Sequence, residues 1–199
     1  LWTVQPHPSQ TQAIWAPFAV LGARWTEGGA GGRNERACNQ YYSELLGDAD
    51  KSIDVQIDNL GREINSRYDD YSPSVTSDGE MMVFTSRRPS VSNDVDELGD
   101  YKYFEDIYFS MWNEEEASWE SAQRFSEQIN TLSHDAVLSI KGSGDQLYIY
   151  KNNQGNAGDI YYSESIDGEL DNWSEPRKLS RPINTSYFES SISITADGN

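Results

Sequence analysis

A set of landmarks that recurs every 54 to 65 residues constrains the fold of this chain more than any other feature. The triplet Ile64-Asn65-Ser66 returns as Ile129-Asn130-Thr131 and again as Ile183-Asn184-Thr185. Thirteen residues after each Asn comes a turn signal: Asp78-Gly79, Ser143-Gly144 and Asp197-Gly198. Landmarks in a constant order and at near-constant spacing indicate tandem structural units.

Each unit contains the signals of four short strands rich in β-branched and aromatic residues. In the second unit these signals cover Ala136–Lys141, Gln146–Lys151, Asp159–Ser163 and Trp173–Leu179. The X-Gly turn joins the first two strands as a hairpin. Four antiparallel strands per repeat are typical of a β-propeller blade, and such blades bury both faces only by stacking. We therefore expect an all-β chain, a partial β-propeller of four-stranded antiparallel blades.

The repeat also predicts how the chain is organised. We expect an irregular segment at 1–35, a short helix and linker at 36–51, and an incomplete propeller at 52–199, with blades 63–127 and 128–181 and the start of a third at 182–199. The helix rests on Ala37, Tyr41 and Leu45, spaced by four residues. The strand signal Asp54–Leu60 should form the edge of a further blade or pair with another chain, and residues 1–33 should contact the blades little. Since propellers close with about four to eight blades, we expect the natural protein to be longer.

Composition excludes several classes of protein. The 33 acidic residues against 15 basic ones give a net charge of −18, which opposes nucleic-acid binding because phosphates repel such a surface. No apolar run reaches the roughly 18 residues of a membrane-spanning helix. A single cysteine, Cys38, excludes an intramolecular disulfide and a Cys-x-x-Cys zinc site; we expect it to be a small buried hydrophobe.

Most landmarks are expected to be structural, because a catalytic group occurs once per protein and these recur once per unit. Asp106 and Asp159 should accept hydrogen bonds from backbone N–H groups at the start of equivalent strands, and Trp119 and Trp173 should pack between blades. The full set of structural repeat positions is Asn65, Asp78, Gly79, Asp106, Tyr108, Trp119, Asn130, Gly144, Asp159, Tyr161, Trp173 and Asn184.

These residues carry a resemblance to a known repeat. The run that includes Pro73, Asp78-Gly79, Ser86-Arg87 and Asp106-Ile107-Tyr108 resembles the WD-like repeat shared with the TolB propeller. In the second unit Ala136 and Lys151-Asn152 replace the Pro and the Ser-Arg, so a less regular inner edge is expected there. The combination of Trp173, Pro176 and Leu179 with Ile183-Asn184-Thr185 resembles the PorE-like, OmpA-domain-containing periplasmic lipoproteins of gliding, type IX secreting bacteria.

Only weak candidates for chemistry remain. Asp94, Asp96 and Asp100 lie in one acidic loop and could ligate Ca²⁺, although a solvated acidic loop is the better explanation, since the spacing does not match an EF-hand. Ser133, His134 and Asp135 are adjacent in a loop, where a triad geometry is not accessible. We therefore predict no catalytic residue and no cofactor, calcium being the one ion considered.

The leading hypothesis for function is a non-catalytic scaffold that binds protein subunits. The resemblance implies a periplasmic, outer-membrane-associated assembly for secretion or gliding, with peptidoglycan reached only through domains outside this chain. Two alternatives stay open. One is an accessory propeller of a peptidase or glycan hydrolase whose catalytic domain lies elsewhere. The other is a carbohydrate- or peptidoglycan-binding propeller, in which Trp112, Tyr101 and Tyr103 stack on sugar rings.

Overall fold

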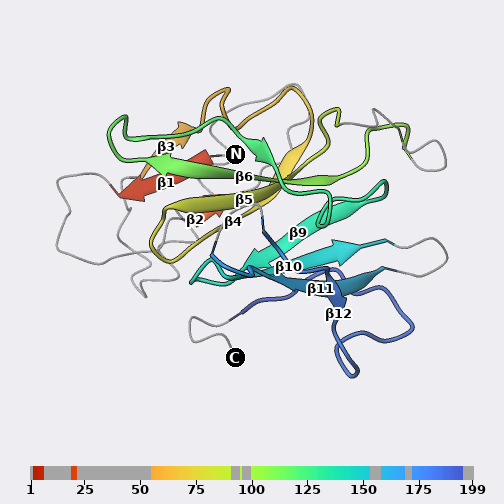
Figure 1. Ribbon diagram of the computed structural model, residues 1–199. Coiled ribbons are helices and arrows are strands. Elements are labelled where there is room, and N and C mark those ends of the chain that lie inside the picture. Colours follow the sequence, from red (N-terminus) through yellow and green to blue (C-terminus); the bar gives the residue numbers. More distant parts are fainter. Residues whose placement is uncertain are drawn as a thin grey trace, which may run out of the picture.

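A computed structural model describes residues 2–6, 19–21, 55–90, 95, 100–152, 158–168 and 172–194, with side chains from residue 58 onward. Within these ranges every regular element is a β-strand, and all strand pairs are antiparallel. The strands form three sheets (Figure 1). The all-β prediction is therefore confirmed. The predicted helix at 36–51 and Cys38 lie outside the described residues. No helix in the described part of the chain is long and apolar enough to cross a membrane.

The first repeat unit forms one sheet. Its strands are β4 (Asp70–Val75), β5 (Met81–Ser86), β6 (Asp106–Asn113) and β7 (Ser118–Trp119), in that order, and β8 (Gln123–Arg124) also pairs with β6. The turn between β4 and β5 needs Gly79, whose φ is +79°, because a side chain disfavours that left-handed conformation. The hairpin predicted at Asp78-Gly79 is therefore confirmed.

The second repeat unit forms a four-stranded sheet. Its strands are β9 (Asp135–Ile140), β10 (Gln146–Lys151), β11 (Asp159–Glu164) and β12 (Arg177–Lys178), in sequential order. The first three lie within one residue of their predicted bounds, and Gly144, with a φ of +76°, makes the predicted β9–β10 turn. The fourth signal is mostly not strand: before β12 it contributes only an isolated bridge between Ser165 and Trp173.

The two sheets stack and share one hydrophobic core (Figure 1). Successive side chains of β5 point to opposite faces, so Met81 and Val83 face the second sheet while Met82 and Phe84 pack in a separate cluster on the far face. Strand β9 lies against the first sheet, where the Val137 N–H donates to Thr85 Oγ1 at 3.0 Å. The shared core contains Met81, Val83, Ile107, Phe109, Phe125, Ile129, Val137, Ile140, Leu147, Ile149 and Trp173.

The N-terminal segment departs from expectation. Strands β1 (Trp2–Pro6) and β2 (Ala19–Leu21) lie within 1–35, and with β3 (Val55–Asn59) they form a three-stranded sheet in the order β2-β1-β3. The prediction of an irregular segment is therefore wrong for these strands. So is the expectation that the Asp54–Leu60 strand lacks a partner in its own chain, since β3 pairs with all five residues of β1. An open strand edge pairs readily with any available strand, and prolines at 6, 8 and 17 obscured the strand pattern.

Candidate functional site

The recurring Asn residues fasten consecutive units to each other. The Asn130 carboxamide accepts from the Ile107 N–H at 2.7 Å and donates to the carbonyls of Ile107 at 2.9 Å and Phe125 at 3.2 Å. Asn184 repeats all three bonds one unit later, to the N–H and carbonyl of Ile160 and to the carbonyl of Leu179. Both Asn residues are 2 % exposed. Asn130 and Asn184 thus have the predicted structural role, and it is the same at both unit boundaries.

A buried ion pair follows each of the first two Asn landmarks. Asp70 caps Ser66, and its other oxygen binds Arg88 at 2.8 Å. Asp135 caps Thr131 in the same way, and its other oxygen binds Lys151 at 2.5 Å. In the second unit Lys151 lies directly opposite Asp135 in the strand pair. In the first unit Ser86 lies opposite Asp70, and the cation comes from Arg88, two residues after Ser86. Lys151 thus takes the place of Arg88 in the ion pair. Both inner strand pairs, β4–β5 and β9–β10, contain a register shift, so the second unit is not less regular there than the first.

Asp106 and Asp159 have a structural role, but they form ion pairs instead of the predicted hydrogen bonds from backbone N–H groups. The carboxylate of Asp106 accepts from the Arg124 guanidinium at 3.0 and 3.1 Å, and that of Asp159 accepts from the Lys178 ammonium at 2.7 Å. These are ion pairs from β6 to β8 and from β11 to β12, rather than bonds to backbone N–H groups. Since Arg124 and Lys178 are equivalent positions, the pair is conserved between the two units with a change of cation.

The remaining repeat positions also contact neighbours within the fold. Trp173 is 2 % exposed and packs edge-to-face on Phe125, so it lies between the two sheets as predicted. The half-buried Trp119 packs against the cluster on the far face of the first sheet. Trp112, expected to be exposed, is half-buried and packs edge-to-face on Trp119 at 5.4 Å. Further contacts complete the set: Asp78 to Thr76 and Glu80, Asn65 to Asn59, Tyr108 to Phe84, and Tyr161 to the shared core.

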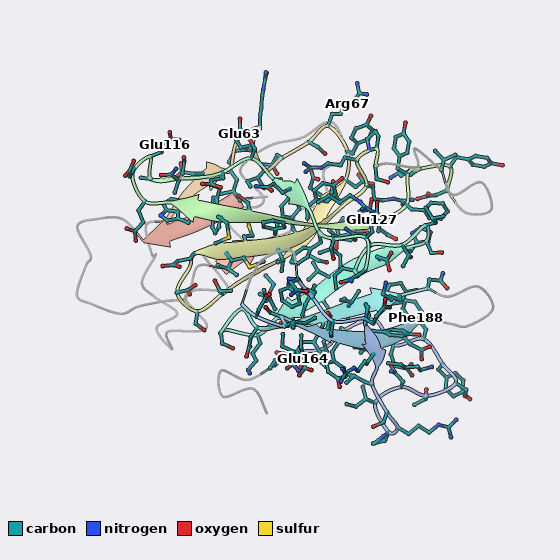
Figure 2. The ribbon with its side chains drawn as sticks, in the orientation of Figure 1. Glu63, Arg67, Glu116, Glu127, Glu164 and Phe188 are labelled. Carbon is teal, nitrogen blue, oxygen red and sulfur yellow. The ribbon has the colours of Figure 1, made fainter. Side chains whose placement is uncertain are left out.

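A group of side chains, of which only Arg87 belongs to the repeat pattern, gathers around one groove near the start of β4 and β6. It encloses a cavity of about 350 Å³. The lining comes from three stretches of chain that are distant in sequence: Arg67, Tyr68 and Asp69; Arg87; and Val95, Tyr101, Lys102 and Tyr103. Figure 2 shows Arg67 at the upper rim of the molecule, far from Glu116 at the other end of β6. On a chain of net charge −18, this groove concentrates three cations and three tyrosines.

Hydrogen bonds hold the groove side chains in position. The Arg87 guanidinium donates to both Asp100 carboxylate oxygens, at 2.6 and 2.8 Å, and to the Tyr103 carbonyl at 2.6 Å. Lys102 binds Asp69 at 2.7 Å. Arg67 donates to the Tyr68 hydroxyl at 2.6 Å, which raises the pKa of the guanidinium, and the Tyr68 and Tyr103 rings meet edge-to-face at 5.6 Å. Asp100 and Asp69 neutralise Arg87 and Lys102. Within the part of the chain that the structure describes, Arg67 has no carboxylate partner, so its charge faces a ligand.

The backbone at the groove is strained at Tyr101. Its φ is +60°, a left-handed conformation that is unusual for a bulky residue. Its side chain is 74 % exposed, so no burial within the chain compensates this strain. Strained residues of this kind cluster at functional sites. The combination points to a surface shaped for contact.

A half-buried polar cluster lies at the same end of the molecule, where Glu105 precedes β6. Glu105 accepts from the Tyr71 hydroxyl at 2.5 Å and contacts His134 Nδ1. Although burial opposes it, hydrogen bonding from His134 and Tyr71 lowers the pKa of Glu105, whereas burial raises that of Tyr71. Asp135 binds Thr131 and Lys151 instead. Ser133, His134 and Asp135 therefore do not form a triad, and the cluster joins the first unit to the second.

The candidate calcium ligands divide between described and undescribed residues. Asp100 is bound on both oxygens by Arg87, and this hydrogen-bonded pairing lowers the pKa of Asp100 to about 2. Asp94 and Asp96 lie outside the described residues. Among the residues that the structure describes, no cluster of three metal-ligating His, Cys, Asp or Glu side chains occurs.

Most of the groove was not predicted from the sequence. Tyr101 and Tyr103 had been singled out as aromatic candidates, but Arg67, Tyr68 and Lys102 had not, because they are distant in sequence and belong to no motif. The only signal in the sequence was a local excess of Arg, Lys and Tyr beside each other at 67–68 and 101–103. In comparisons with protein-family models and with curated proteins, no family and no relative matches this chain.

Proposed function

We propose that this chain is a non-catalytic, propeller-type interaction module that binds another protein through the groove. The observation that carries this is the groove itself, which gathers Arg67, Tyr101 and Tyr103 around a cavity of about 350 Å³ while the repeat residues are engaged inside the fold. Tyr and Arg are the side chains most enriched at protein interfaces and their hot spots. The charge of Arg67 favours a partner segment with a carboxylate beside an apolar or aromatic group.

The way the two sheets stack supports a propeller. Leu147 and Ile149 in the second sheet are equivalent to Met82 and Phe84 in the first, by their places in the repeat. Leu147 and Ile149 face the shared core, whereas Met82 and Phe84 face away from it. The sheets thus pack front to back rather than through equivalent faces. Such heterologous packing can continue from unit to unit and closes into a ring when the rotation permits.

The resemblance to envelope lipoproteins supports a partner within a periplasmic, outer-membrane-associated assembly. A photo-crosslinking side chain placed at Tyr101 in the natural protein, in its own cells, tests this. We expect one discrete protein adduct, identified by mass spectrometry as an envelope protein and lost in an Arg67→Ala variant. Position 116, in the exposed turn after β6, provides the matched control. The same adducts from both positions, or none from position 101, would overturn the proposal.

A carbohydrate ligand is the second candidate, because Tyr68, Tyr101 and Tyr103 present aromatic rings beside hydrogen-bonding groups in the same groove. Amphipathic rings of this kind combine apolar contact with a polar handle. A glycan array and a peptidoglycan pull-down, with a Tyr101→Ala/Tyr103→Ala variant as control, separate the two candidates. Retention by glycan that the double substitution abolishes would favour this second candidate, and a blank result would remove it.

A further inference from the structure

The groove beside β4 and β6 carries one positive charge that the described residues do not compensate. Of its three cations, Arg87 pairs with Asp100 at 2.6 Å. Lys102 pairs with Asp69 at 2.7 Å. Within the described part of the chain, no carboxylate pairs with Arg67. A ligand group with a single negative charge therefore complements the groove, whereas a phosphate, at about −1.5 to −2, would add negative charge to a chain that already carries −18.

The Arg67 guanidinium is oriented for a carboxylate. Its Nη2 donates to the Tyr68 hydroxyl at 2.6 Å, and its central carbon lies over the Tyr68 ring, 4.9 Å from the centroid. The hydrogen bond uses one of the five N–H groups of a guanidinium, and the ring contact restrains the plane of the others. Such a planar group binds a carboxylate through two parallel hydrogen bonds, which are stronger and more directional than neutral ones.

The two walls of the groove are joined by contacts within the chain. Lys102 in one wall binds Asp69 in the other, and the rings of Tyr103 and Tyr68 meet edge-to-face. The buried Arg87 donates to the Tyr103 carbonyl at 2.6 Å and so fixes the second wall from below. A ligand therefore meets walls that are already in position, and such preorganisation raises affinity because less ordering is needed on binding.

The size of the groove favours a single residue over an extended segment. Its cavity of about 350 Å³ lies at the low end of the roughly 300–1,000 Å³ of ligand pockets. Tyr101 and Tyr103 supply aromatic walls, and Tyr101 is 74 % exposed, so a ligand that covers its ring removes apolar surface from water. The last residue of a polypeptide carries a carboxylate and a side chain on one Cα. An internal Asp or Glu supplies only the carboxylate, and its chain must leave the cavity in two directions.

We propose that the groove binds the C-terminus of a partner polypeptide whose last residue is aromatic or large and apolar. The terminal carboxylate binds Arg67, and the side chain packs between Tyr101 and Tyr103. Capture of a C-terminal carboxylate is a recurring mode of peptide recognition. This inference rests on the groove being the interaction site proposed above, and it names the part of the partner that enters it.

A minimal probe tests the carboxylate. N-acetyl-phenylalanine is titrated into the 199-residue chain beside N-acetyl-phenylalaninamide, which lacks only the charge, and the NMR amide signals of residues 101–103 are followed. We expect a Kd on the order of 1 mM for the acid and binding about tenfold weaker or more for the amide, the scale of a hydrogen bond to a charged group. Arg67→Gln should remove that difference, whereas Arg177→Gln, at an exposed position in the second sheet, should keep it. Equal binding of acid and amide, or no shift in a folded chain, would overturn the proposal.

A second probe distinguishes a chain terminus from an internal acidic residue. N-acetyl-aspartyl-phenylalaninamide has the same charge and the same ring, but its carboxylate is on a side chain, and we expect it to bind more weakly than N-acetyl-phenylalanine. Equal or tighter binding would refute the C-terminal mode. Shifts of the 101–103 signals that grow with protein concentration, without any probe, would show that a second copy of the chain fills the groove, and they would refute it as well.

The crosslink at Tyr101 separates failure of this inference from failure of the proposed function. Once the partner is identified, deletion of its last three residues should abolish the adduct. An adduct that persists after the deletion would contradict the C-terminal mode and leave the proposed function intact. Conversely, selective binding of N-acetyl-phenylalanine by a chain that forms no adduct in cells would support the carboxylate site and count against a protein partner.

Discussion

At the scale of the residue, the repeated Asn is explained by what a carboxamide can do in one planar group. Its oxygen accepts while its nitrogen donates two hydrogen bonds, and Asn130 uses all three on backbone groups from the start of β6 and the end of β8. An Asp would lack both donors. The landmark is therefore a fastener between units, which accounts for its return at Asn184 with the same three bonds.

We expect Asn130→Ala to destabilise the chain severely. The substitution leaves the N–H and carbonyl of Ile107 and the carbonyl of Phe125 buried and unpaired, and each such group costs about 1–3 kcal/mol. Urea unfolding should show a loss of about 3 kcal/mol or more. Asn172→Ala, which removes one exposed hydrogen bond to Asp167, is the control and should change stability by about 0.5 kcal/mol or less. A small effect of Asn130→Ala would contradict the role of a fastener.

The Asp100 carboxylate should give the groove a dependence on pH in the acid range. Arg87 lowers its pKa in the folded chain to about 2, below the ordinary value of 3.8. The stabilisation is therefore fully present above pH of about 4 and is lost as the pH falls toward 2. Titration of the Asp100 carboxyl by carbon-detected NMR should give a midpoint near 2, and Arg87→Gln should raise it toward 3.8. An unshifted midpoint in the native chain would refute the pairing.

At the scale of the element, the sequence predicted what depends on neighbours in the chain. The hairpins at Gly79 and Gly144 were predictable because a glycine at positive φ and two flanking strand patterns are local signals. The equivalence of Arg88 and Lys151 was not predictable. These two cations occupy different positions in the repeat, and only their long side chains bring them to equivalent carboxylates. The groove was unpredictable for the same reason: residues 67–69, 87, 95 and 101–103 meet only once β4, β5 and β6 pair.

We expect the β9–β10 hairpin to depend on the pair between Lys151 and Asp135. The two side chains are only 8 % and 1 % exposed, so Lys151→Met leaves a buried carboxylate uncompensated, which costs about 3–5 kcal/mol. Adding Asp135→Asn removes the stranded charge and should restore much of the loss. Chemical denaturation of the four members of this double-mutant cycle measures the coupling. Strictly additive losses would show that the pair contributes nothing of its own.

The exposed pair of Lys102 and Asp69 is the control for that cycle. Both side chains are close to half exposed, at 47 % and 42 %, and the ion pair lies at the rim of the groove. Exposed pairs contribute about 0–1 kcal/mol, so Lys102→Met should leave the midpoint of unfolding nearly unchanged. A large loss of stability in Lys151→Met beside a small one in Lys102→Met would show that the loss comes from burial of the ion pair and not from the removal of a charge.

At the scale of the whole molecule, the two large sheets are one cooperative unit because neither has a complete core alone. Six of the shared core residues come from the second unit and five from the first. Phe125 follows β8 in the first unit, yet its ring meets both Phe109, at 5.0 Å, and Trp173 of the second unit, at 5.5 Å. The 54- to 65-residue repeat is thus a unit of sequence and of architecture, while the unit of stability is at least two repeats, as in other stacked-repeat proteins.

Phe125→Ala tests this directly. The side chain is 2 % exposed at the junction of the sheets, and deletion of a buried phenylalanine costs about 3–5 kcal/mol. Because the core is shared, we expect hydrogen-exchange protection to fall equally in β5 and β10, and unfolding followed by tryptophan fluorescence and by far-UV circular dichroism to coincide. Phe188→Ala, which removes a ring that is 59 % exposed, should leave both sheets protected. If β10 kept its protection while β5 lost it, the sheets would be separate folding units.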